Sequence, residues 1–141
     1  MPIQGADKVI ALFGRWPSFH DAEVARVVLE RERGEPPTAH VLIHTAETTS
    51  AADPARSISV GQECWIELAF GGLAALQLEE FNQQNVLFAL EVEELTEPAI
   101  ESERFKVRFS SSYGMGAEFR CATVHVVRVE PATTRIGRAE A

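Results

Sequence analysis

Apolar and polar residues alternate along most of the chain, which is the pattern of β-strands with one buried face. Seven runs show this alternation or a related apolar pattern. They span residues 23–32, 39–45, 63–70, 73–80, 87–95, 105–111 and 119–129. The sequence therefore predicts a mainly β (α+β) fold of about seven antiparallel strands, in a sandwich or a curled sheet.

Two of these runs carry a further expectation. In residues 87–95 the side chains of Phe88, Leu90 and Val92 share one face, so we expect them to be buried together. Residues 119–129 are apolar on both faces, which is typical of a strand that is central or covered by a helix.

Turn and helix signals separate the runs. An apolar stripe over residues 8–13 predicts one short N-terminal helix, with Asp7 placed to cap its start and Gly14 to end it. The turn at 34–37 joins the first two strands as a hairpin. Gly71-Gly72 predicts a second, tight hairpin between 63–70 and 73–80.

Length and composition favour a single globular unit. The chain has 141 residues, which is enough for one core, and we expect one domain over residues 1–131 with a frayed tail at 132–141. Cys64 and Cys121 lack metal-site spacing, so buried thiols are expected rather than a disulfide. No apolar run is long enough for a membrane helix and no secretory signal is present, so the cytoplasm is expected.

The net charge is −8, which argues against nucleic acid or an anionic membrane as the main ligand. Eight glutamates lie in one segment without an intervening Lys or Arg. They are Glu79, Glu80, Glu91, Glu93, Glu94, Glu97, Glu101 and Glu103. This acidic segment is either a solvated face or a docking surface for a basic protein, with Glu91, Glu93 and Glu97 as candidate contacts.

The chemically densest stretch is residues 16–24. His20 and Asp21 have three interpretations: a structural pair that fixes the entry to the first strand, half of a metal site, or a partner contact. Adjacent residues of an extended segment point to opposite sides, so the two side chains are not expected to converge. Trp16 and Trp65 are core residues or interface anchors. We assign no catalytic, cofactor-binding or metal-binding residue.

Residues 13–24, with their Trp-x-Ser-x-His-Asp core, resemble the opening signature of the bacterial immunity protein 50 family. Residues 76–86 resemble the middle of that family, and Tyr113-Gly114 with residues 118–121 resemble its C-terminal part. The resemblance implies an immunity protein of a polymorphic toxin system, which binds and blocks a cognate toxin in the cytoplasm. It supplies no catalytic residues.

Three hypotheses follow. The leading one is a non-enzymatic protein that neutralises a toxin by contact, with the acidic segment facing a basic patch such as a nuclease toxin would carry. The second is a small enzyme with a metal-assisted site at His20 and Asp21. The third is a structural homodimer that pairs a strand edge or an apolar patch.

Overall fold

The computed structural model describes residues 3–45, 63–96 and 102–132 of the chain. One helix is followed by eight strands. They are α1 (Ala6–Phe13), β1 (Glu23–Glu30), β2 (Thr38–Thr45), β3 (Cys64–Gly71), β4 (Ala74–Glu79), β5 (Val86–Glu94), β6 (Phe105–Tyr113), β7 (Gly116–Cys121) and β8 (Thr123–Pro131). All strand pairs are antiparallel and belong to one sheet, in the order β4-β7-β6-β5-β1-β2-β3-β8. The prediction of a mainly β fold with one short N-terminal helix is confirmed.

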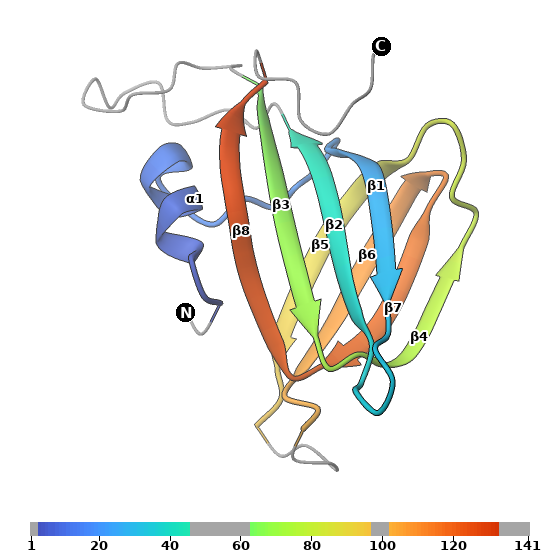
Figure 1. Ribbon diagram of the computed structural model, residues 1–141. Coiled ribbons are helices and arrows are strands. Elements are labelled where there is room, and N and C mark those ends of the chain that lie inside the picture. The colour runs from blue at the N-terminus through green and yellow to red at the C-terminus, as the bar shows by residue number, and fades with distance from the viewer. Residues whose placement is uncertain (1–2, 46–62, 97–101, 133–141) are drawn as a thin grey trace.

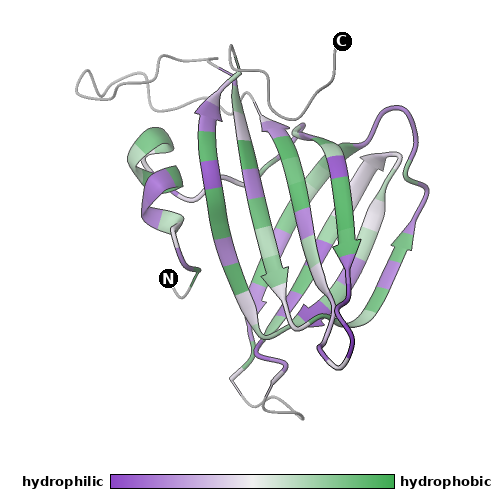
Figure 2. Cartoon of the chain, viewed as in Figure 1, coloured by the Kyte–Doolittle hydropathy of each residue, from purple (hydrophilic) through white to green (hydrophobic). Residues whose placement is uncertain are grey.

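The sheet is folded on itself, so that its two halves form two layers. In Figure 1, β8, β3, β2 and β1 lie in front of β5, β6 and β7, and β4 lies at the right-hand side. Phe70 of β3 joins the layers, since its ring lies edge-on to Phe109 of β6 at 6.1 Å and to Phe119 of β7 at 5.0 Å. The buried apolar side chains of both layers gather between them, and the strand colours of Figure 2 alternate accordingly.

The layers are joined through β1 and β5 at one end only. Glu23 and Val86 form the single residue pair between these strands. Just before it, Ala22 and Leu87 are linked by the Leu87 N–H, which donates to the Ala22 carbonyl at 2.8 Å. Further along β1 the two strands separate, so one side of the sandwich stays unjoined.

A corner connects the two layers at the opposite edge. Gly71 of β3 pairs with Thr123 of β8, and Ala74 of β4 pairs with Arg120 of β7. Between these pairs the Ala122 N–H donates to the Gly71 carbonyl at 2.8 Å. One long antiparallel ladder therefore bends from the first layer into the second.

This corner corrects two predictions. The hairpin between 63–70 and 73–80 is wrong, because β4 pairs with β7 and not with β3. Residues 119–129 are not one strand, since the run divides at Ala122 and gives the eighth strand. Gly72 makes the bend possible: its φ is +69°, and a Cβ there would lie 3.0 Å from the Ala122 Cβ.

The N-terminal segment covers the β8 edge of the sheet. Gln4 forms a parallel bridge with His125; its N–H donates to Val124, and its carbonyl accepts from Val126. Helix α1 then packs Val9 and Phe13 into the core. The expectation that this last strand is apolar on both faces is wrong: β8 shifts register against β3 at Val127, so Val126 and Val129 both lie opposite buried core residues of β3, and Arg128 lies opposite Glu67 on the outer face. The residue at the helix start is Gly5 in a left-handed conformation, so the predicted Asp7 cap is wrong, whereas Gly14 ends the helix as predicted.

Both cysteines are buried and free, as predicted. Burial raises the pKa of the Cys64 thiol, and it raises the pKa of the Cys121 thiol to about 12. No helix in the described ranges combines the length and apolarity needed to cross a membrane.

Candidate partner-binding surfaces

Residues 18–22, which we call the knuckle, have a constrained backbone. Phe19 and Asp21 both have positive φ, at 63° and 66°, in a backbone region that residues other than glycine rarely adopt. The knuckle is held to β5 by three backbone hydrogen bonds. The Asp21 N–H donates to the Leu87 carbonyl at 2.9 Å, the Leu87 N–H donates to the Ala22 carbonyl at 2.8 Å, and the Leu90 N–H donates to the Ser18 carbonyl at 3.3 Å. The Phe19 side chain is fully buried, so it fixes the knuckle to the core.

This backbone brings His20 and Asp21 together in solvent. Their side chains are 55% and 75% exposed, and His20 Nδ1 lies 3.4 Å from Asp21 Oδ2. The expectation that they point to opposite sides is wrong, because the positive φ values on either side of His20 prevent an extended conformation.

Phe88 lies beside the knuckle and is the most exposed of the large apolar side chains described, at 59%. Its ring is 5.5 Å from that of His20, edge to face. The prediction that Phe88 is buried with Leu90 and Val92 is wrong, because β5 shifts register against β6 between Leu87 and Ala89.

The two tryptophans have different surroundings. Trp16 is partly buried against the core, with its ring 5.7 Å from Phe19, so it supports the knuckle. Trp65 is half-buried on the outer face of β3, next to His44 at 4.9 Å between ring centroids. His44 Nε2 in turn lies 2.7 Å from Glu63 Oε1.

The acidic candidates of β5 lie opposite basic residues. Glu91 pairs in register with Arg108, and Glu93 pairs with Lys106. Both basic residues also contact Glu118 of β7, at 3.2 Å from Arg108 and 3.6 Å from Lys106. The outer face around Glu91 and Glu93 is therefore of mixed charge. Glu97 lies outside the described residues.

The outer face of β2, β3 and β8 carries a buried carboxylate. The Glu67 side chain is 11% exposed, with Oε1 2.9 Å from Arg128 Nε and Oε2 3.1 Å from His40 Nδ1. This arrangement satisfies the carboxylate within the sheet, so we treat it as structural. Among the residues that the structure describes, no group of three or more His, Cys, Asp or Glu is arranged to hold a metal ion.

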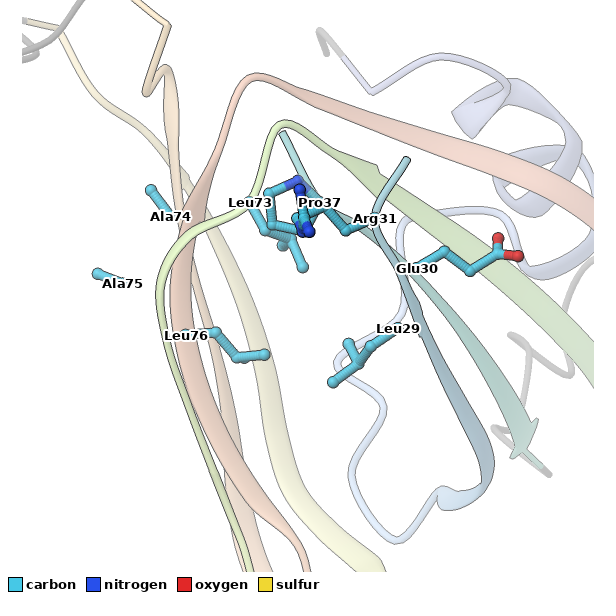
Figure 3. Close-up of a pocket in the computed structure, with 8 residues that line it drawn as sticks. All are labelled: Leu29, Glu30, Arg31, Pro37, Leu73, Ala74, Ala75 and Leu76. Atoms are coloured by element: carbon cyan, nitrogen blue, oxygen red, sulfur yellow. The ribbon is translucent and has the colours of Figure 1, made fainter. Parts of the chain in front are cut away.

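A small apolar pocket lies where β1 and β4 face each other across the unjoined side of the sandwich (Figure 3). Its volume is about 230 Å³. Sequence reasoning missed it, since the residues come from segments that pair with other strands and meet only through the bend of the sheet.

The chain matches the family model described as Immunity protein 50 over residues 5–132. Neither the curated proteins nor the solved structures give a match. The matched range contains α1, the knuckle and all eight strands.

Proposed function

The chain belongs to the Immunity protein 50 family, and on that premise we propose that it neutralises a cognate protein toxin by binding it. The protein would act in the cytoplasm of the producing cell. It would act by occluding the toxin, without catalysis, metal or cofactor.

The structural observation that supports this proposal is the display of His20, Asp21 and Phe88. Strained backbone persists only where the surrounding structure enforces it, and such strain clusters at functional sites. Here it places a polar pair beside an exposed aromatic ring. Protein–protein interfaces commonly have an aromatic residue at the centre and polar residues around it.

Charge suggests the chemistry of the toxin. Asp21 of the knuckle is acidic, and Glu23 pairs with Val86 two residues before Phe88. The whole chain has a net charge of −8. A basic toxin surface with an apolar hollow for Phe88 would complement this region, and a nuclease toxin would present such a surface.

The first test is growth of cells that express the gene immediately upstream, with and without this chain. We expect the neighbouring gene to be toxic and this chain to restore growth. Toxicity that persists in the presence of this chain would refute the proposal for that pair.

A binding measurement then tests the surface. Phe88→Ser should weaken binding to the toxin by about tenfold or more, as expected for an aromatic anchor. Val28→Ser is the matched control, since Val28 is also an exposed apolar residue but lies on β1 opposite His40. Equal affinities for both variants would exclude Phe88 as an anchor.

The absence of metal-assisted chemistry is tested separately. We expect metal analysis of the purified protein to find no bound ion at His20 and Asp21. The melting temperature should also be unchanged by added divalent metal or by a chelator. A stoichiometric ion that is lost in His20→Ala would favour the enzyme hypothesis instead.

A further inference from the structure

The two edges of the sheet are not equivalent. The β8 edge is covered by Gln4 and α1, as described above. At the other edge, β4 pairs only with β7 on one side, and within the described ranges nothing pairs with its second side. A free edge offers unpaired backbone N–H and carbonyl groups to an incoming strand.

The free edge of β4 borders the open side of the sandwich, which we call the seam. Across the seam lies the second side of β1. Among the residues described, this side pairs with β5 at Glu23 and donates the Val24 N–H to the Asn85 carbonyl, and no pairing is found further along β1. The Leu73 N–H donates to the Pro37 carbonyl at 2.8 Å and closes the seam at one end. The pocket of about 230 Å³ lies next to this closure.

Inward-facing leucines line the pocket but are not covered. Leu29 pairs with Ala39, which is buried in the core, yet Leu29 is 47% exposed. Leu76 of β4 is 36% exposed, and Figure 3 shows the two leucine side chains pointing toward each other across the gap. Both residues occupy the face that the rest of the sheet buries, so the core is left open here.

The size of the pocket suits one large apolar side chain. An apolar cavity of about 150 Å³ is enough to bind benzene, and this pocket is larger. Leu29, Pro37, Leu73 and Leu76 provide the apolar lining, while Glu30 and Arg31 are the charged residues that line it.

The surroundings of the seam are predominantly acidic. Exposed glutamates lie at the end of β1, in the turn that follows it, and at the end of β4. They are Glu30, Glu32, Glu35, Glu79 and Glu80, against the two exposed arginines Arg31 and Arg33. A second copy of this acidic chain would bring like charges together, whereas a basic segment would be attracted.

We propose that the seam binds an extended segment of a partner protein. The segment would place one large apolar side chain between Leu29 and Leu76 and present basic residues to the glutamates around the seam. Its backbone would pair with the free edge of β4, as in other cases where a strand is added to a sheet. The identification of this partner as the toxin rests on the proposed function. The expected features of the segment, an apolar side chain flanked by basic residues, rest on the structure of the seam alone.

The pocket contributes most of the selectivity. Ala75 and Glu80 have positive φ, at 56° and 55°, and the register of β4 shifts between Ala74 and Gln77. The backbone of β4 is therefore regular enough to pair only over Gln77–Glu79, where it pairs with β7, and an incoming segment could pair with the same few residues. Such a short ladder cannot select a sequence, so the side chain in the pocket must do so.

The test uses two labelled peptides, Lys-Val-Lys-Phe-Lys-Val-Lys and the same peptide with Ala in place of Phe, in fluorescence anisotropy. Because both peptides carry the same charge, their affinity ratio isolates the pocket. We expect the wild type to prefer the Phe peptide by about fivefold or more. The preference should fall to about one in Leu76→Gln and persist in the control Val28→Gln, with thermal melts confirming that both variants fold.

Equal affinities of the wild type for the two peptides, or a preference that survives in Leu76→Gln, would overturn the proposal. Light scattering provides an independent outcome. We expect a monomer, and a dimer that dissociates in Leu76→Gln would mean that a second copy occupies the seam, which would also overturn it. If this chain rescues growth but shows no preference for the Phe peptide, only the proposal for the seam is refuted. If it prefers the Phe peptide but does not rescue growth, only the proposed immunity function is refuted.

Discussion

Glu67 Oε1 lies 2.9 Å from Arg128 Nε, across the pair of strands β3 and β8. The carboxylate is nearly buried, whereas the arginine side chain is 38% exposed and can reach water. The second carboxylate oxygen of Glu67 contacts His40 of β2, so this one glutamate joins three strands.

Glu67→Ala should lower the free energy of unfolding by about 2–3 kcal/mol, since charge-assisted hydrogen bonds to a buried group are lost. Denaturant unfolding measures this change. Glu118→Ala is the control: Glu118 also contacts two basic residues, but its side chain is 42% exposed. Its loss should cost about 1 kcal/mol or less. Equal costs at the two positions would contradict a special role for burial at Glu67.

Asn85 connects three parts of the fold. It is 3% exposed, and its Oδ1 accepts hydrogen bonds from the Asn82 N–H at 2.8 Å and the Met115 N–H at 3.0 Å. Asn85→Ala leaves the buried Met115 N–H without this acceptor, at a cost of about 1–3 kcal/mol in the free energy of unfolding. Asn82→Ala keeps both backbone bonds and should be nearly neutral. An unchanged unfolding midpoint in Asn85→Ala would refute the stabilising role of the hydrogen bonds that Asn85 accepts.

Gly114 and Gly34 share a φ of +81° but not their surroundings. A Cβ on Gly114 would overlap the Gln84 carbonyl oxygen and lie 2.7 Å from Asn85 Oδ1, whereas nothing lies within 4 Å of one on Gly34. Gly34→Ala should therefore cost only the left-handed strain, about 1–2 kcal/mol, and Gly114→Ala about 2–5 kcal/mol. Thermal or denaturant unfolding compares the two, and equal costs would show that crowding at Gly114 is relieved easily.

The Cys121 thiol makes stability depend on alkaline pH. Its pKa is raised by burial from 9.0 to about 12, so the folded state keeps the proton that the unfolded state loses. This stabilisation is complete below pH 9 and is lost as the pH rises toward 12. Between pH 9 and 10.5 the free energy of unfolding of the wild type should fall by about 1–2 kcal/mol more than that of Cys121→Ala. Parallel curves for the two proteins would contradict the shift.

The sequence predicts the elements better than their pairing. Alternation locates the strands because burial on one face imposes a period of two, and it holds in β3 and β6. It cannot identify partners: Gly71-Gly72 suits a hairpin turn and a corner equally well. The structure resolves this by placing β4 against β7, from a distant part of the sequence.

The candidate surfaces show the same limit. His20 and Asp21 are recognisable as chemically dense, but their exposure together depends on two positive φ values that no residue type there requires. Phe88 carries no sign in its own identity that a register shift will expose it. Glu91 and Glu93 form an acidic run in the sequence and yet lie opposite Arg108 and Lys106 in space.

The bridge between Gln4 and His125 ties the beginning of the described chain to its last strand. β8 also completes β3, and α1 packs against β8, so these early segments lack their final partners until residue 131 has left the ribosome. At about 5–20 residues per second, synthesis of these 141 residues takes roughly seven to thirty seconds. During that time a nascent chain cannot complete its sheet. The protection that we propose would therefore come from molecules finished before a toxin arrives.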